Sequence, residues 1–367
     1  MGCRDRMQAM SPSTYPTTAQ VARTAPARFA FWMLLLALIG LLTACEDARD
    51  PIRVSGPAQG TTYSVTVMNP PSEMNRSALE GAMTQVIERI DAQMSTWRDD
   101  SEVARFNAAP AGEWVPVSPE LAGLTREALG IGRDTNGAFD VTLGPILQVW
   151  GFGADAEQPT RLPTTDELAA ARERTGIGMI EVRDQPPALR KKAAQATLDL
   201  AGLAQGYTVD QLSQRLNDMG ARRYLVELGG ELYARGNKQG STPWRIGVEK
   251  PEAGTREIER VVGLANAGMT TSGDYRDFFE IDGRRFSHTI DPRTGRPVAH
   301  DLRSVTVVAD DAMTADAMAT ALLVMGADAG RRYADAHDIA ALFVSGTAQA
   351  YTESYSKAFE PYLKEAK

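Results

Sequence analysis

The chain has 367 residues, of which 43% are hydrophobic and 23% charged, so it is long enough for one large or two modest domains with a substantial core. Its formal net charge of −8 argues against nucleic acid as a partner, because nucleic-acid phosphates are bound by clustered Lys and Arg side chains. An acidic protein of this kind needs a bound cation or local dipoles to hold a phosphate-bearing ligand.

The N-terminal segment has the composition of an export signal. Arg23 and Arg28 precede the apolar run Phe29–Leu42, which at 14 residues is short for a membrane span and typical of a signal-peptide core. The run ends in "LTAC", which resembles the box at which bacterial lipoproteins are cleaved and lipidated. We therefore expect lipidation of Cys45, and an uncleaved N-terminal anchor with an incidental cysteine is the alternative.

This interpretation divides the chain into a lipoprotein signal peptide at 1–44, a tether at 45–54 and a functional domain at 55–367. It places the protein in the bacterial cell envelope, held at a membrane by its lipid and facing the periplasm. The other cysteine, Cys3, leaves with the signal peptide, so the mature protein is expected to have no disulfide and no thiol chemistry. Its charge also becomes more negative, because the signal peptide contains four arginines and one aspartate.

The rest of the chain mixes predicted helices and strands. Alternation predicts a strand at 61–68, and apolar residues at helical spacing predict an amphipathic helix at 74–94. Further helices are expected at 118–135 with Ser118 as N-cap, at 201–220 and at 314–326, with a short one inside 154–176 and a possible start at Asp100 or Ser101. Strands are expected at 224–236, 244–251, 260–273, 275–290, 304–310 and 339–345. Since these strands follow one another as hairpins, the order favours an α+β fold over a doubly wound α/β sheet.

The common cofactor and nucleophile motifs are missing from the sequence. It contains no G-x-G-x-x-G after a strand, no P-loop, no H-E-x-x-H and no G-x-S-x-G elbow. Three histidines spread over the chain argue against a multi-histidine zinc site. The available chemistry is therefore that of carboxylates, hydroxyls, main-chain groups and a single histidine.

Two helix starts carry candidate ligands. In "TADAMATALLVMG", Asp316 and Thr320 are four residues apart and share one helical face, which suits a hard cation such as Mg²⁺. The alternative is an acidic side chain that interacts with the helix dipole. In "LDLAGLAQGYTVD", Asp199 precedes a turn in which Gly202 and Gly206 allow close approach of a ligand. There the alternative is a helix cap formed by Asp199.

Two further segments carry candidate binding or catalytic residues. The segment 137–153, "GAFDVTLGPILQVWGFG", has three aromatic residues and four glycines that could clamp a flat ring, although a packed loop fits equally well. In "FSHTIDPRTGRP", His288 lies three residues before Asp291 near the end of a strand, so this histidine could be catalytic or structural.

The order of these segments resembles that of the ApbE family, the FAD:protein FMN transferases. The segments are "GTTYSV", "MSTW…SEVARFN", "GAFDVTLGP…WGFG", "LDLAGLAQGYTVD", "LVELGGELYARG", "WRIGVEKP", "TTSGDYRDFF", "FSHTIDPRTGRP" and "TADAMATAL", and they cover about residues 55–350. The resemblance implies a two-lobed, T-fold-like α+β architecture with antiparallel sheets and packed helices around an FAD cleft. It also implies a Mg²⁺-dependent reaction that splits FAD, attaches FMN to a threonine of a redox-complex subunit and releases AMP.

The resemblance also implies roles for individual residues. Asp316, Thr320 and the main-chain carbonyl of Gly202 correspond to the metal ligands. His288 corresponds to the general base for the threonine hydroxyl, and Asp291 could orient its imidazole. The implied FAD contacts are Gln59, Trp97, Ala138, Phe139, Asp140, Asp199, Gln205 and Ile290. Two of these positions depart from the family pattern, since Gln205 stands where Lys or Glu is common and Gln59 where Met is common.

Two other functions are compatible with the same residues. In a periplasmic FAD pyrophosphatase, water would replace the threonine, and the products would be FMN and AMP. In a flavin-binding lipoprotein, no reaction would occur, but His288 together with Asp316 and Thr320 argues against this function because binding alone needs no base.

Overall fold

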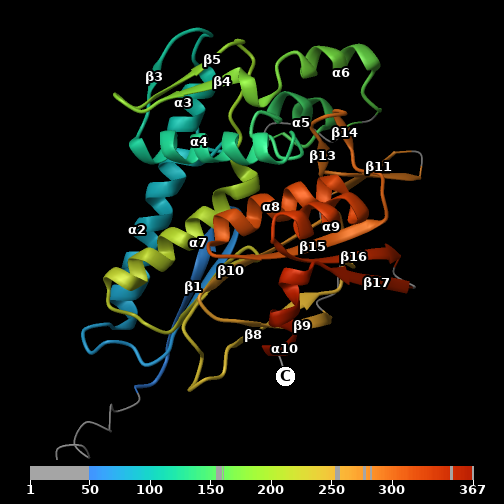
Figure 1. Ribbon diagram of the computed structural model, residues 1–367. Coiled ribbons are helices and arrows are strands. Elements are labelled where there is room, and N and C mark those ends of the chain that lie inside the picture. The colour runs from blue at the N-terminus through green and yellow to red at the C-terminus, as the bar shows by residue number, and fades with distance from the viewer. Residues whose placement is uncertain are drawn as a thin grey trace, which may run out of the picture. The chain divides into compact units, whose positions relative to one another are not determined.

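The computed structural model describes residues 49–153, 159, 161–252, 257–275, 278–281, 283–347 and 350–365 (Figure 1). The chain divides into the units Met1–Ala48 and Arg49–Lys367, and all described residues belong to the second. The predicted signal peptide and Cys45 therefore lie outside the described residues. No helix in the described part of the chain has the length and apolar character needed to cross a bilayer.

An eight-stranded antiparallel sheet forms the centre of the domain. Its spatial order is β1-β2-β6-β7-β10-β15-β16-β17. The strands are β1 (Ile52–Ala58), β2 (Thr61–Val67), β6 (Tyr224–Leu228), β7 (Glu231–Arg235), β10 (Ala267–Gly273), β15 (Leu302–Ala309), β16 (Ala340–Thr347) and β17 (Ala350–Tyr355). Every neighbouring pair is antiparallel, and the register places Thr271 opposite Thr306.

Three long helices pack together on one face of this sheet: α2 (Arg76–Met94), α7 (Ala201–Asp218) and α8 (Ala312–Met325) (Figure 1). α2 begins at Asn75, whose side chain accepts a hydrogen bond from the Ala78 N–H, and it buries the apolar stripe predicted from its sequence. α8 is apolar on nearly all sides and lies between α7 and strands β10 and β15. α9 (Ala327–Ala336) follows it and packs on β16.

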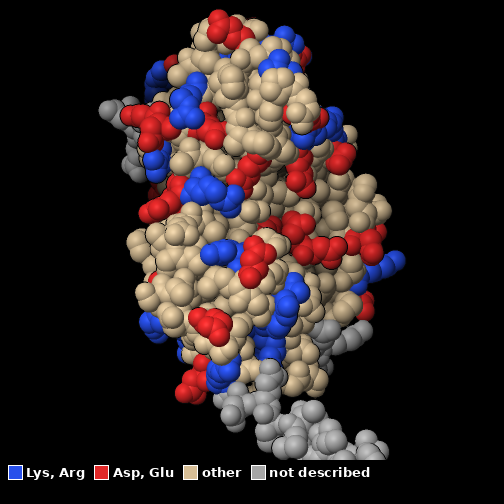
Figure 2. Space-filling model, turned by 90° about the vertical axis from the view of Figure 1, so that its left-hand side faces the viewer, with Lys and Arg blue, Asp and Glu red and all other residues tan. Residues whose placement is uncertain are grey.

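Smaller elements surround this layer. At one end lie α3 (Glu102–Ala108), α4 (Pro119–Asp134), α5 (Gly144–Trp150), α6 (Thr165–Arg172), the 3₁₀ turn Ile177–Met179 and the sheet β3 (Val115–Pro116), β5 (Ala188–Lys191), β4 (Ile180–Arg183) (Figure 1). Two hairpins near them are β11 (Phe278–Ile281) with β12 (Arg284–Ser287), and β13 (Ile290–Asp291) with β14 (Arg296–Pro297). The other face of the large sheet is covered by β8 (Trp244–Glu249), β9 (Ile258–Leu264), the 3₁₀ turn Lys357–Phe359 and α10 (Glu360–Glu365). Acidic and basic side chains are interspersed over the face in Figure 2.

The α+β architecture is the expected one, but several local features differ from the sequence predictions, among them the following. β1 begins at Ile52 and buries Val54 to 3% exposure, so the folded domain starts inside the range predicted as a tether. The strand was not predicted because Gly56 and Pro57 are both uncommon in strands. Pro57 is tolerated because β1 is an edge strand. α5 lies in a segment predicted as a loop, and β4 and β5 were not predicted.

α8 is held unusually close to its neighbours. A Cβ atom at Gly206 of α7 would collide with the Ala312 carbonyl and lie 2.8 Å from the Met313 Cα. A Cβ atom at Gly268 of β10 would lie 2.5 Å from the Ala312 N. Only glycine therefore allows the start of α8 to lie against both elements.

We expect Gly206→Ala to lower the free energy of unfolding by about 1–3 kcal/mol, because the added methyl group forces α7 and α8 apart. The matched control is Gly123→Ala in α4, where a Cβ atom would meet nothing within 4 Å. That control should raise stability by about 0.5–1 kcal/mol, since alanine is the better helix former. Urea unfolding of both variants tests this, and equal effects at the two positions would contradict it.

Candidate functional site

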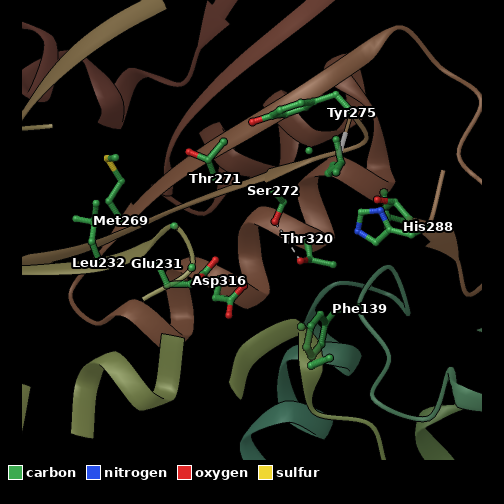
Figure 3. A pocket seen from close by; sticks show the side chains of 18 of the residues that line it. Phe139, Glu231, Leu232, Met269, Thr271, Ser272, Tyr275, His288, Asp316 and Thr320 are labelled. Carbon is green, nitrogen blue, oxygen red and sulfur yellow. Dashed lines mark hydrogen bonds between the residues drawn. The ribbon is translucent and has the colours of Figure 1, made fainter. Parts of the chain in front are cut away.

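A cavity of about 730 Å³ opens beside the helix layer, where the large sheet meets α5 and the β13–β14 hairpin (Figure 3). It brings together residues from distant parts of the sequence. Nine predicted site residues line it: Ala138, Phe139, Asp140, Asp199, Gly202, His288, Ile290, Asp316 and Thr320. The four that do not line it are Gln59, Trp97, Gln205 and Asp291.

Asp316 projects from α8 into the cavity and is only 6% exposed. Its Oδ2 accepts a hydrogen bond of 3.2 Å from the Gly206 N–H, so the close crossing of α7 and α8 also fixes the carboxylate. Burial raises the pKa of Asp316 well above its ordinary value, and the charge of Glu231 raises it further. Figure 3 shows the Asp316 and Glu231 side chains next to each other.

Glu231 is a lining residue that sequence reasoning missed. It begins β7 directly after the turn Gly229–Gly230, lines the same cavity and is 7% exposed. The segment "LGGELYARG" was predicted only as a strand. A signal was available, since an acidic side chain that follows two glycines at the start of a buried strand needs a polar partner or a cation.

Thr320 lies one turn further along α8 than Asp316. Its hydroxyl is 3.2 Å from the Ser272 hydroxyl on β10, and Figure 3 shows the two side chains facing each other. Gly202 lies in the first turn of α7, where a Cβ atom would approach the Phe139 ring to 3.1 Å. The predicted metal-ligating residues therefore meet at one cavity.

This set of donors fits Mg²⁺. A cation bound here would balance the charge of the neighbouring buried carboxylates Asp316 and Glu231 when both are ionised. Carboxylate, hydroxyl and main-chain oxygens are hard donors, and Mg²⁺ needs few of them because water and substrate phosphates complete its shell. No group of three or more His, Cys, Asp or Glu side chains suited to a metal occurs among the described residues.

The turn at Ala138–Asp140 forms another wall of the cavity. Asn136 and Gly137 adopt positive φ values of 52° and 75°, and the Thr135 hydroxyl accepts a hydrogen bond from the Phe139 N–H. Asp140 accepts hydrogen bonds from the N–H and the hydroxyl of Thr142, at 2.8 and 2.6 Å. Burial raises the pKa of the Asp140 carboxyl.

Asp199 lies beside this turn, just before α7. Its carboxylate accepts a hydrogen bond of 2.9 Å from the Ala201 N–H two residues further on, and its own N–H donates to the Val141 carbonyl. Burial raises the pKa of Asp199 as well. The N-cap of α7 is Leu200 and has no side-chain cap hydrogen bond, so Asp199 is not the expected cap residue, and it forms part of the cavity wall instead.

His288 follows β12 and projects into the cavity, where Figure 3 shows its imidazole directed towards the side that holds Thr320. Asp291 does not hold this imidazole in the way we expected. Both of its carboxylate oxygens accept hydrogen bonds from the Arg293 guanidinium, at 2.8 and 3.0 Å, and one also accepts from the Arg293 N–H. Asp291 therefore stabilises the turn that contains it, because its carboxylate is bound by Arg293 two residues further on.

The three other predicted FAD contacts lie outside the main cavity. Gln59 lines a second cavity of about 540 Å³ and donates hydrogen bonds to Asp91 and to the Thr208 hydroxyl, at 3.2 and 2.9 Å. Trp97 is 78% exposed on the turn after α2. The side-chain amide of Gln205 lies over Gly229, 3.1 Å from the position that a Cβ atom would take there.

Asp210 of α7 binds the first N–H groups of α8. Its carboxylate accepts hydrogen bonds from the N–H groups of Ala312 and Met313, at 2.8 and 2.9 Å. Burial nevertheless raises the pKa of Asp210 to about 7, and the charges of Asp311 and Glu127 act in the same direction.

A raised acid pKa means that the folded protein keeps the Asp210 proton between about pH 4 and pH 7, after the unfolded chain has lost it. The free energy of unfolding should therefore fall as the pH rises through this window, by a few kcal/mol from this group. We expect Asp210→Asn to remove that part of the slope in urea unfolding from pH 5 to pH 8. The control is Asp218→Asn at an exposed position of α7, and an unchanged slope in Asp210→Asn would contradict the prediction.

Known proteins resemble this chain over most of its length. The model of the ApbE family matches residues 59–343. Proteins named FAD:protein FMN transferase from Vibrio cholerae and Haemophilus influenzae are 38% and 36% identical, over 90% and 89% of this chain and 98% and 96% of theirs. The apo structure of the Pseudomonas stutzeri flavinyl transferase ApbE superposes with a TM-score of 0.79 at 37% identity, and the match covers 87% of this chain and 98% of that one.

Together, the fold, the cavity and these relatives define an α+β enzyme of the transferase class. The chain belongs to the ApbE family.

Proposed function

We propose that the protein is a Mg²⁺-dependent FAD:protein FMN transferase, which joins FMN through a phosphoester bond to a threonine of a target flavoprotein subunit and releases AMP. The observation that carries this proposal is the shared cavity, where His288 faces the hard oxygen donors Asp316 and Thr320 (Figure 3). A base beside a candidate cation site is what phosphoryl transfer to a weakly nucleophilic hydroxyl requires.

In this proposal each wall of the cavity has one task. FAD binds to Ala138, Phe139, Asp140, Asp199 and Ile290. The hydrogen-bonded turn at Ala138–Asp140 keeps its pyrophosphate in one place. Asp316, Thr320 and the Gly202 carbonyl would hold the cation. When bound, Mg²⁺ supplies positive charge that neutralises the pyrophosphate.

His288 would act on the incoming acceptor. Its imidazole takes the proton from the threonine hydroxyl as the oxygen forms a bond to the phosphorus of the FMN half. The bond from that phosphorus to the bridging oxygen breaks, and AMP leaves with the bridging oxygen. Ser272 would hold the Thr320 hydroxyl in place during this step through the contact of 3.2 Å.

The proposal is tested by incubating the protein with FAD, Mg²⁺ and a flavin-carrying subunit of a membrane redox complex. Transfer gives a fluorescent band on a denaturing gel, and the band must vanish when the acceptor threonine is replaced by valine. AMP and FMN without a band would indicate hydrolysis of FAD instead. Bound FAD with neither product would leave flavin binding as the function.

We also propose that the protein is anchored to the membrane by lipid on Cys45 and faces the periplasm. The "LTAC" box after the apolar run at 29–42 supports this proposal. Labelling cells with a clickable fatty acid should mark the wild-type protein and leave Cys45→Ala unmarked. Labelling of the Cys45→Ala variant would contradict the assignment.

A further inference from the structure

Four aromatic residues form a cluster behind His288, which we call the aromatic cluster: Trp150, Phe152, Phe279 and Phe286. Phe279 lies 5.4 Å from Phe286 and 5.1 Å from Phe152 between ring centroids, and Trp150 lies 5.8 Å from Phe286. The cluster therefore joins the end of α5 to the β11–β12 hairpin, which leads directly into His288.

The "WGFG" sequence places two of these rings by turning the chain sharply. Trp150 ends α5, and its indole N–H donates a hydrogen bond of 2.8 Å to the carbonyl of Gly295 in the β13–β14 turn. Gly151 has a φ of 79°, which sends the chain back so that the Phe152 N–H reaches the Leu147 carbonyl at 2.9 Å. A Cβ atom at Gly153 would overlap the Gln148 side chain. The glycines thus aim both aromatic side chains at the hairpins that carry His288.

Phe152 is the member of the cluster that contacts the histidine. Its ring and the imidazole have centroids 6.4 Å apart and planes at 72°, an edge-to-face arrangement. The terminal torsion of a histidine side chain is broad, so an unconstrained imidazole samples many orientations. An edge-to-face contact with a ring that is itself packed limits this rotation.

We propose that Phe152 is a positioning residue for His288, which keeps the imidazole turned into the cavity through this contact. The link to catalysis relies on the proposed function, because it matters for turnover only if His288 is the base. The contact itself is independent of that function and is tested without any substrate. Phe152 does not line the cavity, so its role is exerted through His288.

The first test is the NMR spectrum of histidine ring protons in selectively labelled protein, which contains only His288, His300 and His337. The His288 signal is assigned from its loss in His288→Gln. We expect Phe152→Leu to broaden or split this signal, while Phe152→Tyr, which keeps the ring, leaves one sharp signal. The matched control is Phe286→Leu, which removes an equivalent ring from the same cluster but leaves Phe152 in place.

The second test is kinetic. Phe152→Leu should lower kcat for FMN transfer at least about tenfold with little change in KM for FAD, since misorientation of the base affects the chemical step. Phe152→Tyr should restore kcat. Phe286→Leu should lower the midpoint of thermal unfolding as much as Phe152→Leu does, yet keep kcat near the wild-type value.

The proposal is overturned if the His288 signal stays single and sharp in Phe152→Leu. It is also overturned if Phe152→Tyr or Phe286→Leu changes the signal as Phe152→Leu does, because the effect would then belong to packing in general. Failure of the wild-type protein to transfer FMN would count against the proposed function alone, since the NMR result does not depend on it.

Discussion

Replacement of His288 by alanine is expected to reduce FMN transfer by about 10²–10⁴-fold, the range by which a positioned general base accelerates proton transfer. FAD binding should remain close to that of the wild type, because the lining residues proposed to bind FAD are those of the turn at Ala138–Asp140, Asp199 and Ile290. Transfer is measured as fluorescent acceptor formed per unit time, and FAD binding by isothermal titration without acceptor.

The matched control for this change is His337→Ala. His337 lies at the end of α9, where its ring stacks on Tyr333 with centroids 4.2 Å apart, and it is not part of the cavity. The control should transfer FMN at the wild-type rate. If His288→Ala still transferred FMN within a few-fold of the wild type, the base would have to be another group.

Asp316→Asn is expected to have opposite effects on the protein with and without Mg²⁺. Without the cation, the variant should be more stable than the wild type at pH 7, by about 1–3 kcal/mol, because burial and the charge of Glu231 disfavour the ionised carboxylate. The amide oxygen can still accept the Gly206 N–H. With Mg²⁺ at a hundred times its Kd, the wild type should gain about 2.7 kcal/mol, and the variant far less.

Thermal unfolding at increasing Mg²⁺ concentration measures both effects in one experiment. Asp328→Asn, at an exposed position in the first turn of α9, is the control and should respond to Mg²⁺ as the wild type does. Equal stabilisation of Asp316→Asn and the wild type by Mg²⁺ would remove Asp316 from the set of ligands. A loss of stability without Mg²⁺ would show that the carboxylate is structural.

Local patterns were sufficient to predict most of the helix layer. These predictions depend on residues within one or two helical turns. They rest on the apolar spacing of α2, the N-caps Ser101 and Ser118, and the apolar composition of α8. β1 was missed because Gly56 and Pro57 interrupt its alternation, while pairing with β2 provides the stability that its own sequence lacks. A strand formed by such long-range pairing leaves only a weak signal in its own residues.

The site was predictable to the extent that its residues fall in recognisable motifs. Asp199 directly precedes α7, Asp316 and Thr320 lie four residues apart on α8, and the structure brings all three to one cavity. Glu231 was missed because its neighbour Asp316 belongs to another element, and their proximity arises only when β7 packs beside α8. For Asp291 the sequence spacing suggested a contact with His288. In the structure its carboxylate pairs instead with the Arg293 guanidinium, two residues away.

The tight crossing at Gly206 has a consequence for how the site would fail. The proposed metal ligands belong to the two helices that this glycine holds together, Gly202 to α7 and Asp316 and Thr320 to α8. The separation of α7 and α8 therefore sets the width of the proposed cation site before any ligand binds. If α7 and α8 lay slightly further apart, the site would lose its selectivity among divalent ions while the domain stayed folded. Mg²⁺ requires a strict geometry with short ligand distances, and a wider site would also accept the larger Ca²⁺.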